Sequence, residues 1–403
     1  MSDLTRIAIS PRRIRQRNEL AVLRALHEHG RSSRADLARV LGLNRSSSGN
    51  IIQNLLTERL VHEVEDDAKH GSGKAGRPGI LLELVPDAVS FLGIEIGVEH
   101  ISAVELDLAG RVTRSRQEPF DGRATGVELA LARALHLAME TMPPERLARC
   151  EGVGIATPSQ MDRAGMIRLA PLMGWRDVDM AALARQILPP DMAVMVENDA
   201  NAFAIGVTYG RRNARNGVTL LVNIESGVGG GILIDGQLFR GATGLAGEIG
   251  HLRMAQDDPE TLEQRIGLAR LLAQYRQRTD RAEATLPDLL RDVRDREPQA
   301  VAIAEDWARA LAFALSQVCR IIDADAVVLG GSVAALYPMV SARVLTHLRG
   351  YQEVCFTLPA ITLAESVATG AAYGAACMVH QRFLSLESAR FSAADYVDTT
   401  KDG

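Results

Sequence analysis

The sequence contains neither closely spaced cysteines nor a long apolar run. Its four cysteines stand far apart and form no C-x-x-C pair, so we expect buried free thiols from Cys150, Cys319, Cys355 and Cys377. No apolar stretch is long enough to span a membrane, and the short, Arg-rich run after Met1 is not a signal peptide. These absences argue against a membrane partner and predict a cytoplasmic location.

The length and the charge distribution predict several domains with different partners. At 403 residues the chain exceeds one ordinary core, so two or three domains are expected. Residues 1–80 hold 14 Lys and Arg against 9 Asp and Glu, a net charge of +5 within a chain whose total is −5. The remainder therefore carries −10, and only the basic N-terminal part is suited to a polyanionic partner.

The N-terminal residues have the pattern of a winged helix-turn-helix. Apolar residues recur at helical spacing over 12–29, and Gly30 ends that helix. A second helix is expected after Ser32 or Ser33, either of which can cap it. A turn at Gly42 then leads to a third helix over about 45–59, and a short strand over 60–64 predicts the first arm of a wing.

The third helix carries the residues expected to read DNA. Its apolar residues share one face, and the polar side chains on the other are Arg45, Ser46, Ser47, Asn50 and Gln53. Such a helix fits the major groove, because Arg, Asn and Gln have hydrogen-bonding geometry suited to base edges. The alternative is a helical bundle that binds another protein, but the basic, serine-rich face favours DNA.

Residues 71–79 read Gly-Ser-Gly-Lys-Ala-Gly-Arg-Pro-Gly and contain a small Gly-Arg-Pro core with Arg77 at its centre. Pro78 disfavours a helical conformation at Arg77, and a narrow A·T minor groove attracts such an arginine. The same composition is typical of a flexible interdomain linker. Both interpretations remain open, since an arm and a linker can be the same segment.

From Leu81 onward, short β-like runs separated by glycines alternate with helices, among them long helices expected at 261–277, 298–322 and 366–383. This alternation is typical of an α/β fold. Two strand-rich halves predict two lobes with a cleft between them.

Three polar strings interrupt this body. Residues 197–203 read Glu-Asn-Asp-Ala-Asn-Ala-Phe, residues 225–231 read Glu-Ser-Gly-Val-Gly-Gly-Gly, and residues 241–251 read Gly-Ala-Thr-Gly-Leu-Ala-Gly-Glu-Ile-Gly-His. Their carboxylate, amide and imidazole groups can hydrogen-bond a polyhydroxylated ligand from several sides. Together the strings resemble the ROK family (repressors, open reading frames and kinases), over residues 12 to about 380. The resemblance implies an actin-like, ribonuclease H-like body of two lobes behind the winged helix-turn-helix.

The resemblance also implies roles for single residues. In ROK kinases the aspartate that matches Asp199 is the general base that takes a proton from a sugar hydroxyl. In a repressor the same group only holds the sugar, so we expect no catalytic residue. The positions expected to bind a sugar or sugar derivative are Asn198, Asp199, Glu248, His251 and Glu263. The alternative for each is an ordinary capping or structural role.

The chain departs from the family in its phosphate loops. ROK kinases have an Asp-x-Gly-Gly-Thr loop, whereas residues 95–100 read Glu-Ile-Gly-Val-Glu-His and lack the second Gly and the Thr. Glu99 and Glu225 add negative charge where phosphates would lie, so a vestigial ATP site and no cofactor are predicted.

Two further departures concern a metal and the ligand. His251 matches one ligand of the family's zinc site, but residues 252–263 contain no cysteine, and one imidazole cannot replace four ligands. We therefore predict that the zinc site is absent and that no metal is bound.

Leu172 stands where the family often has Asn, so an apolar contact replaces an amide hydrogen bond to the sugar, which changes ligand preference.

The complete prediction is a homodimeric or homotetrameric transcriptional repressor of carbohydrate metabolism, with a double-stranded DNA operator and a sugar effector. Residues 1–80 would bind DNA, residues 81–198 and 380–403 would form the first lobe, and residues 199–379 the second. One alternative is a ROK-type sugar kinase with an N-terminal DNA-binding appendage. Another is a regulator whose effector is a protein or a phosphotransfer partner.

Overall fold

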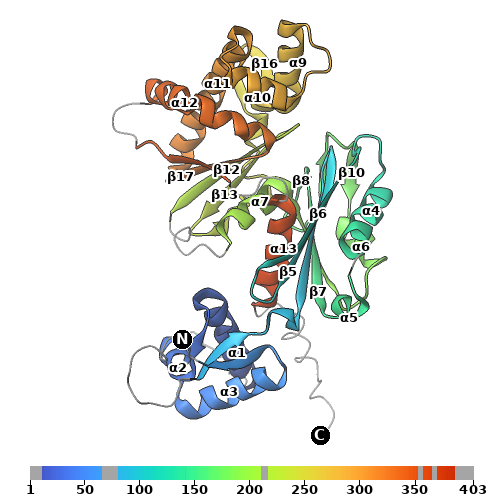
Figure 1. Ribbon diagram of the computed structural model, residues 1–403, viewed down its shortest axis with the longest axis vertical. Helices are drawn as coiled ribbons and strands as arrows, with labels where there is room; N and C mark the ends of the chain where they lie inside the picture. The colour runs from blue at the N-terminus through green and yellow to red at the C-terminus, as the bar shows by residue number, and fades with distance from the viewer. Residues whose placement is uncertain are drawn as a thin grey trace, which may run out of the picture.

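The computed structural model consists of a small N-terminal domain and a two-lobed body (Figure 1). The structure describes residues 11–65, 80–140, 142–209, 217–352, 357–364 and 370–385. Within these ranges no helix is long and apolar enough to cross a membrane.

The N-terminal domain is a winged helix-turn-helix. Its elements are α1 (Pro11–His29), β1 (Ser32–Ser33), α2 (Arg34–Leu41), α3 (Arg45–Thr57), β2 (Val61–Glu65) and β3 (Ile80–Leu84). Ser33 caps α2, because its hydroxyl accepts a hydrogen bond from the Asp36 backbone N–H at 3.1 Å. Gly42 ends α2 at a φ of 64°, a conformation that glycine adopts without steric cost. Strands β2 and β3 pair antiparallel and form the wing, and Arg77 lies between them, outside the described residues.

The first lobe is built on a five-stranded sheet of order β11-β7-β4-β5-β6. Strands β4, β7 and β11 are parallel, whereas β5 and β6 continue β4 as an antiparallel meander. The elements are η2 (Pro86–Ala88), β4 (Ser90–Ile96), β5 (His100–Asp107), β6 (Val112–Pro119), α4 (Val127–Met139), α5 (Pro144–Leu147), β7 (Cys150–Thr157), β8 (Gln160–Met161), β9 (Ile167–Ala170), β10 (Trp175–Val178), α6 (Met180–Arg185) and β11 (Ala193–Asn198).

The second lobe repeats this topology. Its sheet has the order β14-β13-β12-β17-β18, again with the first strand in the middle and the second strand antiparallel to it. The elements are β12 (Val218–Ile224), β13 (Val228–Ile234), β14 (Gln237–Leu238), η4 (Ile249–His251), β15 (Arg253–Ala255), β16 (Asp258–Thr261), α8 (Leu262–Ile266), α9 (Leu268–Thr279), α10 (Leu286–Arg294), α11 (Pro298–Ile322), β17 (Ala326–Gly330), η5 (Ser332–Leu336), α12 (Tyr337–Tyr351) and β18 (Ala360–Leu363). Two lobes with the same sheet topology, on either side of a cleft, form the actin-like arrangement that was predicted.

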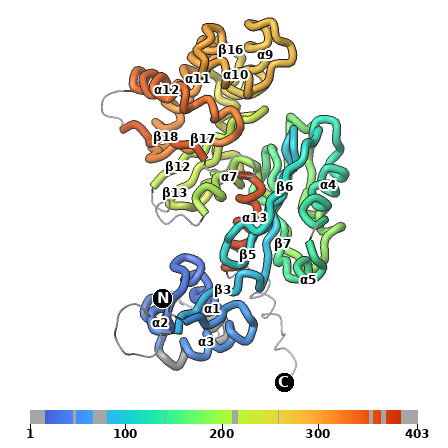
Figure 2. Tube along the Cα trace, in the orientation of Figure 1, coloured from blue at the N-terminus to red at the C-terminus, as the bar shows by residue number. Residues whose placement is uncertain are grey.

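Two helices lie between the sheets: α7 (Asp199–Thr208) and α13 (Gly370–Phe383). They pack closely, because a Cβ at Gly374 would lie 1.6 Å from the carbonyl oxygen of Ala202. Figure 2 shows α13, from the end of the chain, beside β5 and β7 of the first lobe. The expected lobe boundary at residue 380 falls inside α13, which packs against the first sheet from its first turn onward.

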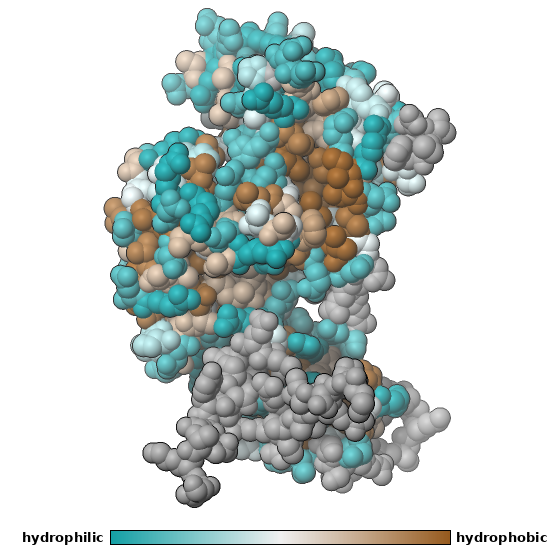
Figure 3. Space-filling model, turned by 180° about the vertical axis from the view of Figure 1, so that it is seen from behind, coloured by the Kyte–Doolittle hydropathy of each residue, from teal (hydrophilic) through white to brown (hydrophobic). Residues whose placement is uncertain are grey.

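One expected element is divided. The helix predicted over 261–277 is two helices, α8 and α9, because Gly267 takes an extended conformation with φ −70° and ψ 159°. Thr261 and Gln264 form a capping box that starts α8 beside the cleft. Seen from behind, polar and apolar side chains are mixed over the described surface of the body, and the largest group of apolar ones lies toward the right of the view (Figure 3).

Candidate functional site

The residues predicted to read DNA belong to α3. Ile51 and Ile52 of this helix are buried, whereas Asn50 and Gln53 are exposed and, three residues apart, share a face. Arg45, Ser46 and Ser47 form the first turn, but their side chains lie outside the described part of the chain, as does the whole of Arg77. The predicted reading face is therefore open to solvent where it is described, and its contact with DNA stays a prediction.

A pocket lies between the two lobes of the body. Its walls come from the ends of β4 and β11 and the start of α7 on one side, and from the β12–β13 turn, η4 and α8 on the other. Its cavity volume is about 120 Å³. All five residues that the sequence predicted to bind a ligand line it: Asn198, Asp199, Glu248, His251 and Glu263.

Asn198 fixes the start of α7 in the wall of the pocket. It caps α7, because its Oδ1 accepts a hydrogen bond from the Asn201 backbone N–H at 3.0 Å. Its Nδ2 donates to the carbonyl oxygen of Ser159, also at 3.0 Å. With both ends of the carboxamide engaged, Asn198 holds the first turn of α7 in place and thereby positions its neighbour Asp199.

Asp199 is the first residue of α7 and is half-buried. Burial raises the pKa of its carboxyl to about 7, and the negative charges of Glu95 and Glu248 act in the same direction. Backbone N–H groups at the start of the helix oppose this rise. Near neutral pH Asp199 therefore exists both as a carboxylate that accepts hydrogen bonds and as an acid that can donate one.

Glu248, His251 and Gln160 form a second polar group in the pocket. The Nε2 atom of His251 lies 3.6 Å from Glu248 Oε2 and 3.2 Å from Gln160 Nε2. Burial raises the pKa of Glu248, against the effect of His251 and with that of Glu263. Sequence reasoning missed Gln160, because no motif marks it; the β8–β9 pairing brings it to the cleft.

Glu263 and Leu172 lie near the β12–β13 turn. Glu263 Oε2 accepts a hydrogen bond from the Val228 backbone N–H at 3.0 Å. A Cβ at Gly227 would lie 3.0 Å from that oxygen and 3.3 Å from Leu172 Cδ1, so this position has little room for a side chain. Leu172 is half-buried and lines the pocket, where it offers an apolar contact.

The other end of the pocket is acidic. Glu225 accepts hydrogen bonds from the backbone N–H and the hydroxyl of Ser332, both at 2.5 Å, at the start of η5. The hydroxyl of Ser226 donates to Glu99, which links the β12–β13 turn to the β4–β5 turn. Burial raises the pKa of Glu225. Carboxylates from both lobes thus accept hydrogen bonds from donors of the second lobe.

His100 and Glu95 complete this acidic end. The His100 Nε2 atom lies 3.5 Å from Glu95 Oε1, and Ser102 Oγ donates to Glu95 Oε2 at 2.9 Å. The hydrogen bond to Glu95 raises the pKa of His100, as do the charges of Glu95, Glu225 and Glu99. A positive charge is therefore stabilised at this end of the pocket.

Comparison with known proteins matches two parts of the chain to two family models. Residues 91–382 match the model of the ROK family, and residues 15–71 match that of the MarR family. The chain belongs to the ROK family. It is 24% identical to the xylose repressor of Bacillus subtilis over 355 residues, which cover 85% of this chain and 91% of the repressor.

Solved structures of ROK proteins share this fold. A ROK family transcriptional regulator, a homolog of the E. coli MLC protein, has a TM-score of 0.76 at 19% identity and covers 92% of this chain and 97% of its own. A ROK family glucokinase from Streptomyces griseus, in complex with glucose and AMPPNP, has a TM-score of 0.64 at 24% identity and covers 72% of this chain and 99% of its own. The family thus includes regulators and kinases, and the regulator matches over both the N-terminal domain and the body.

The residues of this ROK chain do not fit the zinc site that the family resemblance implies. The segment after His251 folds into the short β15–β16 hairpin and contains no cysteine. Cys150, Cys319 and Cys377 are free thiols far from it in sequence, and nowhere in the described ranges are three or more His, Cys, Asp or Glu arranged to hold a metal ion. The imidazole of His251 lies instead beside Glu248 and Gln160. The absence of zinc itself stays a prediction.

Proposed function

We propose that this ROK protein is a cytoplasmic transcriptional repressor whose affinity for an operator is controlled by a sugar or sugar derivative in the pocket between the lobes. One observation carries this proposal: the polar groups expected to bind a sugar converge on one pocket in a chain that begins with a winged helix-turn-helix. The relatives named as repressors support it, since the similarity to them extends over most of the chain.

Helix α7 offers a physical path from the pocket to the N-terminal domain. It begins at Asp199 in the pocket and ends about 15 Å further on at its C-cap, Tyr209. The Tyr209 hydroxyl contacts His380 Nδ1 on α13, and the His380 Nε2–H donates to the carbonyl oxygen of Leu108 at 2.9 Å. Burial lowers the pKa of His380 to about 3, so the ring is neutral and keeps these roles.

The N-terminal domain rests on the far end of this path. The ring of His27, on α1, lies with its centroid 4.9 Å from that of His380 and 5.5 Å from that of Tyr209. Arg24, one turn earlier on α1, donates from Nε to the carbonyl oxygen of Leu384 at 2.6 Å. A shift of α7 or α13 caused by a ligand would therefore reach α1 directly.

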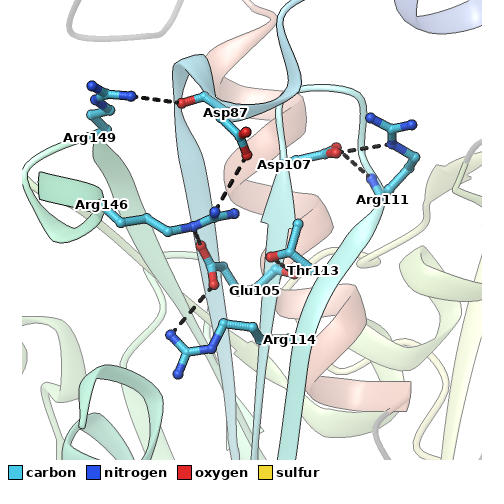
Figure 4. Close-up of polar contacts among 8 residues, drawn as sticks. All are labelled: Asp87, Glu105, Asp107, Arg111, Thr113, Arg114, Arg146 and Arg149. Carbon is cyan, nitrogen blue, oxygen red and sulfur yellow. Dashed lines mark hydrogen bonds and ion pairs between the residues drawn. The ribbon is translucent and has the colours of Figure 1, made fainter. Parts of the chain in front are cut away.

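The segment that connects the winged domain to the body is also fixed by contacts with the body. Arg149 donates to the carbonyl oxygen of Asp87, in η2 between wing and body, at 3.3 Å (Figure 4). Arg146 lies 3.4 Å from the Asp87 carboxylate and also pairs with the buried Glu105. The winged domain is thus attached to the body at two places, so closure of the cleft would turn it and alter the population that binds DNA.

Binding to a labelled operator, selected by the protein from random duplexes, tests the proposal. We expect one sugar of a monosaccharide panel to lower operator affinity about tenfold and to raise the melting temperature. His251→Ala should lose the sugar response and keep the operator affinity measured without sugar.

Asn50→Ala should keep sugar binding and lose base discrimination, which corresponds to about 1–3 kcal/mol for one good contact. A panel in which no sugar changes either quantity contradicts the proposal.

A sugar kinase remains a second candidate because of Asp199. A carboxyl whose pKa is about 7 is well matched to general-base catalysis at neutral pH. Against a kinase, the acidic end of the pocket would repel the phosphates of ATP. A coupled ADP-release assay separates the two: turnover that Asp199→Ala abolishes would establish the kinase, and we expect none above background.

A further inference from the structure

The pocket contains more negative charge than a neutral sugar requires. Six carboxylates line it: Glu95, Glu99, Asp199, Glu225, Glu248 and Glu263. Among the described residues that line it, none is Lys or Arg. The guanidinium of Arg123 lies 3.7 Å from Glu99 but on an exposed side chain that does not line the pocket.

Hydroxyl and backbone N–H groups hydrogen-bond most of these carboxylates, and the imidazoles of His100 and His251 lie beside two of them, Glu95 and Glu248. Glu95 accepts from the hydroxyl of Ser102, Glu225 from Ser332, and Glu263 from the backbone N–H of Val228. Hydrogen bonds from hydroxyl and amide groups stabilise an ionised carboxylate without cancelling its charge. Two imidazoles do not balance six carboxylates, so negative charge is left for a ligand to balance.

Asn223 adds an independent sign of a ligand at the acidic end. It lies on β12 beside Leu221, on the face of the sheet directed toward α7, and only 8% of its surface is exposed. It lines the pocket, and within the described residues its carboxamide makes no hydrogen bond. The polar atoms of Asn223 are not among the described side-chain atoms that are fully buried without a partner, so they face the open pocket and are available to a ligand.

The pocket already stabilises the positive charge of one side chain. The pKa of His100 is raised by its hydrogen bond to Glu95 and by the charges of Glu95, Glu225 and Glu99, against the cost of burial. The same carboxylates would attract a ligand cation against the repulsion of His100, because six carboxylates outnumber the two imidazoles that line the pocket.

We propose that the effector is an amino sugar, with its protonated amine between Glu95, Glu99 and Glu225 and within reach of Asn223. Its hydroxyl groups would then face Asp199, Glu248 and His251. This inference rests on the proposed function, because it names the chemical class of the effector for the same pocket. A separate metal ion beside a neutral sugar would supply the same charge, but the described residues hold no group arranged to bind one.

Titration calorimetry with matched sugars at pH 6.5 tests the inference. The pairs are glucosamine with glucose, galactosamine with galactose and mannosamine with mannose, and the N-acetylated forms serve as neutral controls of similar shape. We expect at least one amino sugar to bind about tenfold or more tightly than both its parent and its N-acetyl form. Glu99→Gln, at an exposed position in the β4–β5 turn, should reduce that preference at least about threefold. The matched control Glu118→Gln, on β6 outside the pocket, should leave it unchanged.

The outcomes distinguish failure of the amino-sugar inference from failure of the proposed function. Equal or tighter binding of a neutral sugar overturns the amino-sugar inference and leaves the proposed function standing. Binding of a neutral sugar only when MgCl₂ is added overturns it too, in favour of a separate cation. A preference for an amino sugar that Glu99→Gln does not change overturns the assignment of the acidic end. Failure of every sugar to bind removes both the inference and the proposed function.

Discussion

Asp199 lies at the start of a helix, in a pocket with five other carboxylates, and its protonation state follows from that environment. Burial raises its pKa from 3.8 to about 7, and Glu95 and Glu248 add to the rise. Asn198 beside it is engaged at both ends of its carboxamide. The two neighbours therefore differ in role: Asn198 holds the backbone, and Asp199 presents a titrating group to the pocket.

Replacing Asp199 by Asn changes how stability depends on pH. As pH rises above about 4, the unfolded chain releases this proton while the folded chain retains it up to about pH 7. The free energy of unfolding of the wild type therefore falls as pH rises from about 4 to about 7. Above pH 7 this loss of stability no longer changes with pH. We expect Asp199→Asn to be more stable than wild type by about 1–2 kcal/mol above pH 7, after allowance for solvent screening, and equal to it near pH 4.

Urea denaturation at a series of pH values measures this difference. Asp257→Asn, in the exposed turn between β15 and β16, is the matched control for loss of a carboxyl outside the pocket. A difference between Asp199→Asn and wild type that does not change with pH would show that the surroundings do not raise the pKa of Asp199.

At the scale of elements, α7 runs from the pocket between the lobes to the contact with the N-terminal domain. Its residues pack against α13 so closely that Gly374 has no space for a Cβ. Two helices in such contact move as a unit, because a packed interface resists small continuous deformation. The pocket end of α7 and its Tyr209 end are therefore expected to shift together.

Tyr209→Phe tests this path, because it removes only the hydroxyl that contacts His380. We expect sugar affinity in the absence of DNA to stay within about twofold of wild type. The ratio of operator affinities without and with sugar should fall about three- to tenfold, which corresponds to part of a typical coupling energy. Fluorescence anisotropy with labelled operator measures the ratio. Tyr351→Phe, in the second lobe, is the control, and a coupling ratio unchanged by both substitutions would exclude the Tyr209 contact from the path.

At the scale of the whole molecule, one reading helix is joined to one body through α1 and η2. A single winged helix-turn-helix contacts one half-site, and two copies related by a two-fold axis read two. The apolar area seen from behind the body is a surface of the kind that self-association buries (Figure 3). We therefore expect a dimer or a tetramer to be the DNA-binding form.

Footprinting of a selected operator checks this expectation. Two protected half-sites should lie about 10–10.5 base pairs apart, centre to centre, or a multiple of that spacing. Sedimentation equilibrium should give an even number of 43.5 kDa chains in the complex. A monomer that protects a single half-site with full affinity would contradict the two-fold arrangement.

Much of this organisation could be predicted, because it depends on local patterns. Helical spacing and the Ser33 cap place α1, α2 and α3, and the alternation of β-like runs with helices indicates the α/β body. The comparisons confirm the ROK family and the winged helix-turn-helix. The single helix predicted over 261–277 was wrong, since Gly267 divides it where the chain turns beside the pocket.

The sequence by itself determined which chemical groups are present and near which helix or strand each lies, because caps, turns and periodicity act over a few residues. Only the tertiary structure decided that Gln160, Asn223 and Glu95 share a pocket with His251, and that Tyr209 meets His380 and His27. Those contacts join residues up to hundreds of positions apart. They exist because two sheets of one topology close on α7 and α13, a global packing that no short segment encodes.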